Sequence, residues 1–452
     1  MLYELSKILE SIKYENLSEL TVEKAKITIL NFLGTGLAAA KSPVTRAEIA
    51  IWKEIGGTGD CVILGNSGRV SALAAASVNA LMGQTYLLED CHEHTLSHPG
   101  VVAIPVALAL GQSECASGKQ VIEAVVAGYE AMGRIGGVLI APGFPNFGLR
   151  PASTLAPFGG AAAAAKIFGL DAEGICAALA ITGNTASGVM EFVNSGAEDI
   201  CLQNCFAAKS AVMAAMLARE GVGGSASILS GQFGLGRAMN RMELDWSPAL
   251  EANPGHYMID ESFIKRFPGC GHVLATAQAA TELTARQKID PEEIKAVYVG
   301  VSKGATEFPG VDNQGPFSGT ISAMMSHQFM VASVLVHGEV TARTVDMFDD
   351  PGVASVAKKI FVDLDEQVDK AFPRKTGAKL KILMKNGEEF SDFQEDLKPL
   401  DRDEVAARFR NCAGRYFSEK RSADIVDKTL SIESLETLGE LMDLLQPAGH
   451  TE

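Results

Sequence analysis

The hydrophobic periodicity of the chain constrains its fold more than any other feature. From residue 1 to about residue 260, Ala, Leu, Ile and Val recur at helical spacing, and glycine-containing joints interrupt them. Two examples are residues 160–169, an alanine-rich run, and residues 207–220, whose small side chains let neighbouring helices approach closely. This pattern predicts a large helical domain whose helices are buried on most of their faces.

The periodicity changes after residue 265, where three segments have the pattern of β-strands. In residues 296–301 the valines alternate as one strand face, and residues 360–364 form a second candidate strand. In residues 379–382, leucine and isoleucine alternate with two lysines, and Asn386 and Gly387 follow as a two-residue hairpin turn. These signals predict a smaller α+β domain.

Length and the C-terminal pattern predict how the chain is divided. A chain of 452 residues exceeds what one hydrophobic core usually organises, so we expect two domains. Residues 401–445 return to helical patterning, and such a terminal segment usually packs on a larger neighbour. We therefore predict a mainly α fold, with a discontinuous helical domain over residues 1–265 and 399–452 and a smaller α+β domain over residues 266–398.

The charge balance limits the partners that we expect. The formal net charge is −16 and the acidic residues are spread along the chain, which opposes binding to nucleic acid or to an anionic membrane surface. No apolar run approaches the roughly 20 residues of a membrane span. The N-terminus lacks the basic start and apolar core of a signal peptide. We therefore expect a cytoplasmic protein whose partner is a small molecule.

The eight cysteines lack the paired spacing of a zinc site or a redox motif, so we expect reduced thiols. One hypothesis treats Cys91 with His92, or Cys270 with His272, as a thiol nucleophile and its base. Residues this close in sequence rarely point at one another, which weighs against the hypothesis.

The densest polar cluster spans residues 89–100 and contains three of the eight histidines. A metal site is one hypothesis, because His94 and His98 would share a helix face and His92 could add a third nitrogen. Pro99 and the weak helix formers before it oppose a helix here, so we predict no metal site. Acid–base chemistry by histidine near neutral pH and a plain structural loop are the remaining interpretations.

A second polar feature, residues 263–272, lies at the predicted domain junction. Lys265 could pair with a substrate carboxylate there, or lose its proton on burial and act as a base. The alternative is a solvated lysine before a turn. The glycine-rich residues 231–236 follow no predicted strand, so they do not indicate a nucleotide cofactor.

Several short segments match, in order, the motifs of a known protein family. Residues 79–80, 87–92 and 98–100 correspond to its motifs Asn-Gly, Asp-Phe-Asp-Asp-Thr-His and His-Pro-Ser/Gly. Further similarity lies in residues 128–130, 134–136, 217–221, 265–270, 326–329 and 337–340. On these motifs, which cover almost the full length, the chain resembles the MmgE/PrpD family.

The resemblance implies a fold, a reaction class and a set of site residues. Family members have a helical domain, a smaller lid domain, a cleft between them and a homodimeric assembly. They act without a cofactor on a carbon beside a carboxylate. By this resemblance, the catalytic residues are His98, Lys265, His92 and Asp90. The residues that would bind substrate are Arg150, Gln203, Cys91, Cys270 and Ser326, and no metal is implied.

Other positions depart from the family pattern. The first Asp of the family loop is Leu87 here, the Thr is Cys91, and the His of a Gly-Phe-His stretch is Arg150. A Lys, a His and a Tyr of the family align with Gln203, Phe206 and Phe329. Loss of these proton donors disfavours the departure of hydroxide, whereas the new arginine is a permanent cation that can clamp a carboxylate.

We therefore predict a cofactor-independent lyase or isomerase, of the dehydratase or epimerase type, that removes a proton beside the carboxylate of a small organic acid. His98 and Lys265 would carry protons, and Arg150 would bind the carboxylate. The alternative is a catalytically silent protein of the same fold that binds a carboxylate or a protein partner.

Overall fold

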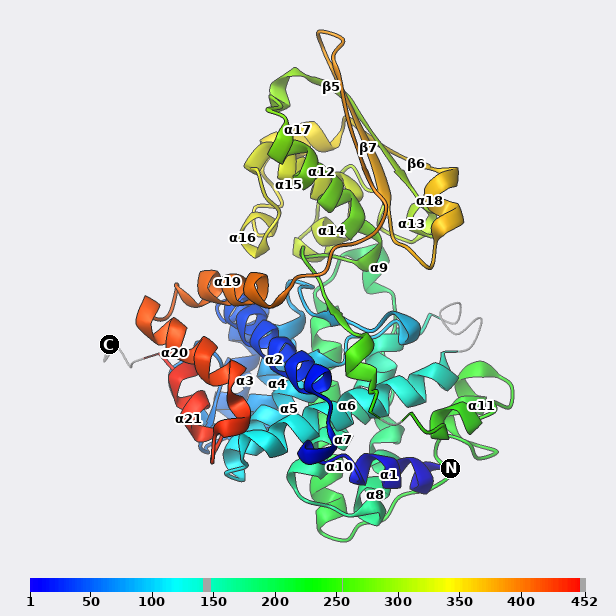
Figure 1. Ribbon diagram of the computed structural model, residues 1–452, viewed down its shortest axis with the longest axis vertical. Helices are drawn as coiled ribbons and strands as arrows, with labels where there is room; N and C mark the ends of the chain where they lie inside the picture. The colour runs from blue at the N-terminus through cyan, green and yellow to red at the C-terminus, as the bar shows by residue number, and fades with distance from the viewer. Residues whose placement is uncertain (141–147, 254, 448–452) are drawn as a thin grey trace.

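The computed structural model describes residues 1–140, 148–253 and 255–447, and it has two parts stacked along the long axis of the molecule (Figure 1). The lower part is helical, and the upper part contains a four-stranded sheet. The predicted fold class, mainly α with a smaller α+β part, is confirmed. The predicted domain limits stay a prediction, and they include residues outside the described ones, namely 141–147, 254 and 448–452.

The lower part is built from long helices that pack on one another. Its N-terminal helices are α1 (Leu2–Glu10), α2 (Glu19–Ala39), α3 (Pro43–Ile55), α4 (Ala72–Gln84), α5 (Gly100–Ser113) and α6 (Gly118–Leu139). They are followed by α7 (Pro151–Ile167), α8 (Ala172–Thr182), α9 (Phe192–Ser195), α10 (Asp199–Arg219) and α11 (Leu235–Asn240). Two short antiparallel strand pairs join these helices, β1 (Cys61–Val62) with β2 (Arg69–Val70) and β3 (Asp90–Cys91) with β4 (Phe263–Ile264).

Small residues allow the central helices to approach closely, as the sequence predicts. A Cβ atom added to Gly160 of α7 would lie 2.7 Å from the Cβ of Ala211 in α10 and 2.9 Å from a methyl of Val102 in α5. Real Cβ atoms do not come this close, so glycine is required where α7 crosses its neighbours.

The upper part is a sheet with helices on one face. Its strands are β5 (Ile294–Val301), β6 (Ile360–Leu364), β7 (Ala378–Met384) and β8 (Glu389–Gln394), in the order β6-β5-β7-β8. β5 and β6 are parallel, and the other neighbours are antiparallel. The three predicted strands are thus present, and the predicted hairpin turn joins β7 to β8, with Gly387 in the left-handed conformation at φ 89°.

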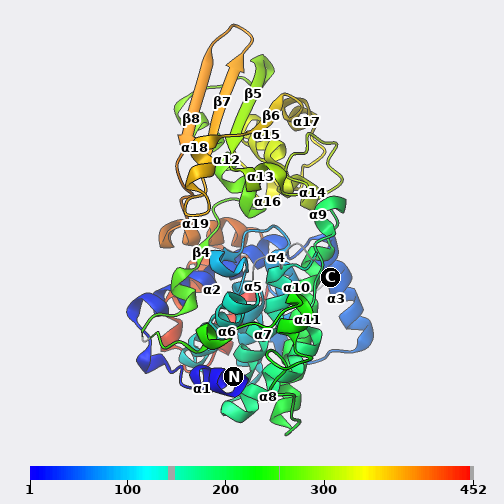
Figure 2. The same ribbon diagram turned by 90° about the vertical axis from the view of Figure 1, so that its right-hand side faces the viewer.

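The helices of the upper part are α12 (Leu274–Arg286), α13 (Lys303–Glu307), α14 (Thr320–Met325), α15 (His327–His337), α16 (Ala342–Val345), α17 (Pro351–Ala357) and α18 (Glu366–Ala371). α12 and α15 pack on each other and against the sheet, as the side view shows (Figure 2). The sheet thereby buries the valine face of β5, which the alternation in the sequence predicts.

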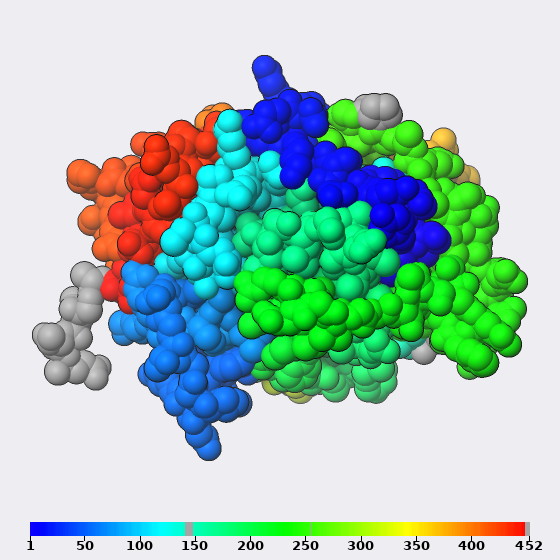
Figure 3. Space-filling view, turned by 90° about the horizontal axis from the view of Figure 1, so that it is seen from below, coloured from blue at the N-terminus to red at the C-terminus, as the bar shows by residue number. Residues whose placement is uncertain are grey.

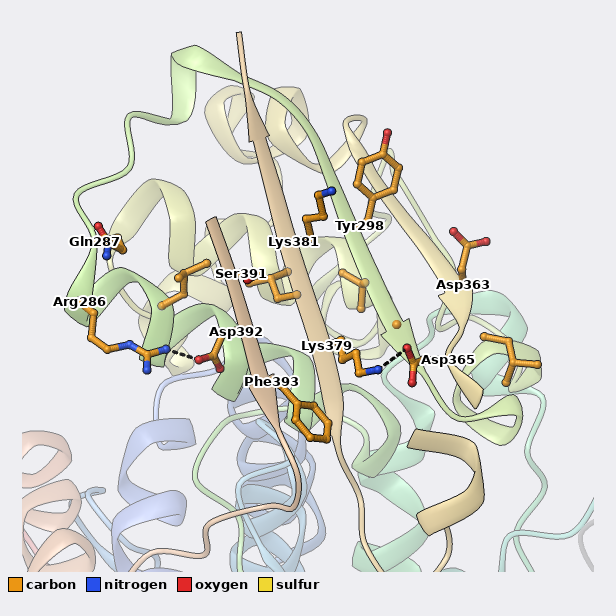
Figure 4. A pocket seen from close by; sticks show the side chains of 15 residues that line it. Arg286, Gln287, Tyr298, Asp363, Asp365, Lys379, Lys381, Ser391, Asp392 and Phe393 are labelled. Atoms are coloured by element: carbon orange, nitrogen blue, oxygen red, sulfur yellow. Dashed lines mark hydrogen bonds and ion pairs between the residues drawn. The ribbon is translucent and has the colours of Figure 1, made fainter. Parts of the chain in front are cut away.

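The opposite face of the sheet is open to solvent. Tyr298, Lys381 and Phe393 project from it, and Lys379 pairs with Asp365 at 2.9 Å (Figure 4). A shallow hollow of about 750 Å³ covers this face. None of the residues that the sequence predicts for the site lines it.

The C-terminal helices of the described chain lie on the lower part. The last helices, α19 (Arg402–Ala413), α20 (Glu419–Leu430) and α21 (Gly439–Met442), return from the sheet, and α19 and α20 pack on α2. Seen from below, N-terminal, central and C-terminal segments share one surface (Figure 3). The helical part is therefore made from both ends of the sequence.

One expectation about apolar runs needs correction. Among the described helices, α10 is long and apolar enough to cross a membrane by length and composition. It packs against α4, α7 and α8, and 56% of its most apolar window is buried inside the molecule. Its composition matches that of a core helix, since a helix covered on several sides needs apolar residues on all of them.

Candidate active site

A two-residue strand pair brings the two polar features of the sequence together. Asp90 pairs with Ile264 and Cys91 with Phe263, so the histidine-rich loop lies beside the segment that carries Lys265. Arg408 of α19 fixes the segment that carries Lys265, because its guanidinium donates hydrogen bonds to the backbone carbonyls of Lys265 and Arg266 at 2.7 Å. Segments more than 170 residues apart thus form one site.

A buried ion pair lies at the centre of this site. Lys265 Nζ is 2.5 Å from a carboxylate oxygen of Glu89, and each side chain is 2% exposed. Burial alone would lower the pKa of Lys265, but the Glu89 charge outweighs burial and raises it. Burial likewise opposes ionisation of Glu89, but Lys265 holds its pKa below the usual value. The lysine is therefore protonated, and the idea that burial turns it into a base is wrong.

His98 is a neutral imidazole beside the ion pair. Its Nδ1 donates to the Asp90 carbonyl at 2.9 Å and lies 3.5 Å from Glu89. Burial and, secondarily, the Lys265 charge lower the pKa of His98 to about 3. The proton therefore resides on Nδ1, and Nε2 keeps its lone pair. Among the described residues Nε2 has no hydrogen-bond partner, and the side chain is 19% exposed.

The Asp90 carboxylate faces away from the cavity and anchors the loop. It accepts hydrogen bonds from the Tyr129 hydroxyl at 2.7 Å and from the Gly100 amide at 3.3 Å. Burial raises the pKa of Asp90 to about 6. A Cβ at Gly100 would collide with this carboxylate, so α5 must begin with glycine. The Asp90 carboxylate therefore lies outside the cavity wall. The backbone carbonyl of Asp90 accepts the hydrogen bond that orients His98.

His92 is buried at the edge of the same site. Its Nδ1 lies 2.8 Å from the Thr95 hydroxyl, and Nε2 lies 3.6 Å from a Glu261 oxygen. Burial lowers the pKa of His92. The neighbouring His94 points to solvent, with 80% of its side chain exposed. The described residues contain no group of three His, Cys, Asp or Glu side chains that could hold a metal ion.

Arg150 is a buried cation without an acidic partner. Its guanidinium lies 3.0 Å from the Ser153 hydroxyl and 3.5 Å from the amide oxygen of Gln203, and it covers the ring of Phe192. No carboxylate of the described residues lies within ion-pair distance. The side-chain amide of Gln203 donates a hydrogen bond to the Val189 carbonyl at 2.9 Å. This bond fixes the amide oxygen that orients the Arg150 guanidinium.

The cysteines of the site are buried thiols. The sulfur of Cys91 lies 3.4 Å from Nδ1 of His98, so its contact is with that histidine and not with the adjacent His92. Burial raises the pKa values of Cys91 and Cys270. A thiolate is therefore disfavoured at both positions, which weighs against the nucleophile hypothesis.

Three other positions lie away from the cavity. Ser326 caps α15, since its hydroxyl accepts from the Phe329 amide and donates to the Asn313 carbonyl at 2.6 Å. Phe329 is buried in the core of the upper part, and Phe206 is exposed on α10. The structure therefore does not bring Ser326 to the site.

A cavity of about 330 Å³ joins the two parts of the molecule. Of the residues predicted from the sequence, its walls contain His92, His98, Lys265, Arg150, Cys91 and Cys270, whereas Asp90, Gln203 and Ser326 stand outside them. The upper part closes the cavity with Phe308, Met325, Phe372, Pro373, Thr376 and Leu397.

The sequence interpretation missed Glu89 as the partner of Lys265. Regular strand alternation could not have found it, because Leu87 has a positive φ of 48° and the neighbouring Cys91 and His92 both line the cavity. Glu89 also lines the cavity, whereas the Asp90 carboxylate accepts a hydrogen bond from Tyr129. His272, also in the wall, stacks on Phe308 with ring centroids 4.5 Å apart, and burial lowers its pKa to about 4.

Fold and site together define a class of two-part, mainly helical proteins with a cavity between the parts that buried histidine, lysine, glutamate and arginine side chains line. The model of the MmgE/PrpD N-terminal domain matches residues 3–246, and that of the MmgE/PrpD C-terminal domain matches residues 267–432. The chain belongs to the MmgE/PrpD family.

Relatives of known name align over nearly the whole chain. Cis-aconitate decarboxylase of Aspergillus terreus is 24% identical over 94% of this chain and 91% of its own. The human cis-aconitate decarboxylase is 23% identical over 97% of this chain and 93% of its own, and the mouse protein is 23% identical over 97% and 92%.

Proposed function

We propose that this protein is a cofactor-independent lyase or isomerase that removes a proton from a carbon beside a carboxylate of a small organic acid. One observation carries the proposal: neutral His98, whose Nε2 has no hydrogen-bond partner among the described residues, shares a cavity with Arg150, whose guanidinium has no ion-pair partner among them. A carboxylate of the substrate would accept a charge-assisted hydrogen bond from Arg150. The α-carbon of the substrate would then lie next to Nε2 of His98, which acts as the base. The family membership and the decarboxylase relatives support lyase-type action on a carboxylic acid.

The proposed reaction begins when Nε2 of His98 takes the α-proton and becomes imidazolium. The electron pair of the broken C–H bond moves toward the carboxylate, whose growing negative charge Arg150 stabilises. In an isomerase, a proton returns to the same carbon, from Lys265 or from the imidazolium. In a lyase, the pair forms a carbon–carbon double bond while the β-substituent leaves with its own bonding pair and takes a proton from Lys265.

The test is proton exchange in heavy water, followed by NMR on small carboxylates whose α-carbon is acidified by a neighbouring alkene, imine or carbonyl. The His98→Asn variant should lower the exchange rate by roughly 100-fold or more. His94→Asn is the matched control, because this histidine lies on the same loop and is exposed. Equal exchange in wild type and His98→Asn would remove the proposal.

The second candidate is a carboxylate-binding protein without turnover. It is favoured by Lys265, whose proton is held by Glu89 and is therefore harder to donate. This candidate predicts that carboxylates raise the melting temperature, that Arg150→Gln abolishes the effect, and that no acid exchanges its α-proton.

A further inference from the structure

The charges of the cavity wall leave one positive charge that a ligand can neutralise. Lys265 is neutralised by Glu89, and the wall histidines are neutral because burial lowers their pKa values. Among the described wall residues, Arg150 is then the one cation without a carboxylate partner. Glu93, exposed at the rim, repels further anions.

Most of the remaining wall is apolar. Both parts of the molecule contribute to it, with Leu87, Phe192 and Ile200 from the lower part and Phe308, Met325 and Leu397 from the upper part. Such side chains cannot hydrogen-bond to a carboxylate, and burying an unpaired carboxylate against them is strongly unfavourable. An alkyl or alkenyl group instead gains from leaving water there.

We propose that the substrate is a monocarboxylate with an apolar substituent, and not a di- or tricarboxylate. This inference rests on the proposed function, whose site it describes. The carboxylate binds Arg150, and the apolar substituent occupies the wall that Phe308 and Met325 close from above. Arg150 and His98 both line this cavity, so a carboxylate bound to Arg150 occupies the same space as that base.

The cavity volume agrees with a small acid. Pockets for drug-sized ligands hold roughly 300–1,000 Å³, and this cavity of about 330 Å³ lies at the lower end. A second carboxylate would lose its water shell and find only neutral donors in the described wall, such as the hydroxyls of Ser97 and Thr376, and no second unpaired cation to offset that cost.

A matched pair of acids tests the substrate class. Hex-3-enoate and hex-3-enedioate share a six-carbon skeleton and an α-carbon acidified by the alkene, and they differ in one carboxylate. Titration calorimetry should show at least tenfold tighter binding of hex-3-enoate, and the Arg150→Gln variant should lose it. Equal or tighter binding of hex-3-enedioate, or no binding of either acid, would overturn the inference.

A variant with an added cation sharpens the test. Phe308→Arg keeps a planar group that can stack on His272 and adds a charge to the apolar wall. It should reduce the preference for hex-3-enoate by tenfold or reverse it. Phe393→Arg adds the same charge on the open face of the sheet and should leave the preference unchanged. An unchanged preference in Phe308→Arg as well would contradict the inference.

Exchange in heavy water, measured on the same samples, separates the two proposals. If hex-3-enoate binds more tightly and neither it nor any other acid exchanges its α-proton, the inferred ligand class holds and the catalytic proposal fails. If exchange occurs with dicarboxylates and not with hex-3-enoate, the catalytic proposal holds and the inferred class fails.

Discussion

At the scale of single residues, the buried pair of Glu89 and Lys265 is the feature with the largest expected energetic effect. Removing one partner leaves the other charge buried and unpaired, which destabilises proteins by about 3–5 kcal/mol. We expect Glu89→Gln to lower the free energy of unfolding by that amount in urea denaturation. Glu404→Gln is the control, because it breaks the more exposed Arg266 pair, where about 1 kcal/mol or less is at stake. Similar losses in both variants would refute the prediction.

His98 should make the stability depend on pH. Its pKa is about 3 in the folded protein, against 6.5 for an ordinary histidine. Between these values the unfolded chain binds more protons, so stability is full above pH 6.5 and falls as the pH drops toward 3. At pH 4.5 the loss from this residue is about 2–3 kcal/mol. Urea denaturation at pH 7 and 4.5 should show a smaller loss for His98→Asn than for wild type; equal losses would contradict the assignment.

The residues of the site show what a sequence can predict. The family resemblance predicts His98, Lys265 and Arg150 for the site, because its motifs are local in the sequence, and the structure places all three side chains in one cavity wall. Glu89 was missed because its role depends on a partner 176 positions away in the chain. The resemblance predicts Ser326 as a substrate-binding residue, whereas the structure places its hydroxyl as the cap of α15, outside the cavity wall; a motif beside a helix start looks the same in either case.

At the scale of elements, two helical glycines should respond in opposite directions to the same substitution. Gly160→Ala places a methyl 2.7 Å from Ala211, and overpacking of this kind costs about 1–3 kcal/mol. Gly137→Ala in α6 meets nothing within 4 Å, so higher helix propensity should stabilise by about 0.5–1 kcal/mol. Thermal unfolding of both variants tests this prediction. A change of the melting temperature in the same direction in both variants would contradict it.

The predictability of an element follows from where its determinants lie. The hairpin of β7 and β8 was predicted, because Asn386 and Gly387 encode the turn locally. The pairing of β3 with β4 was not, since each strand has two residues and no alternation can be seen in so few. Yet this pair brings the two halves of the site together.

At the scale of the whole molecule, Arg408 links the C-terminal helices to the site. It donates to the carbonyls of Lys265 and Arg266, and burial lowers its pKa to about 10. We expect Arg408→Lys, which loses the double contact, to lower the exchange rate by roughly 10-fold to 100-fold through misplacement of Lys265. Arg402→Lys on the same helix is the control, because its partner Glu23 lies at the surface. A rate equal to wild type in Arg408→Lys would show that the contact is dispensable.

The discontinuous lower part has a consequence for synthesis. α19 closes over α2, where Gly34 leaves room for the backbone of Phe409 at 3.2 Å from an added Cβ. A chain still on the ribosome carries α2 from the start but receives α19 only near the end. Until then the face of α2 that packs against α19 is uncovered. The backbone carbonyls of Lys265 and Arg266 also lack the hydrogen bonds that Arg408 donates to them. The hydrogen bonds to the Lys265 backbone are thus completed only after α19 has been translated, and a chain cut short before α19 would leave this face of α2 open to chaperones.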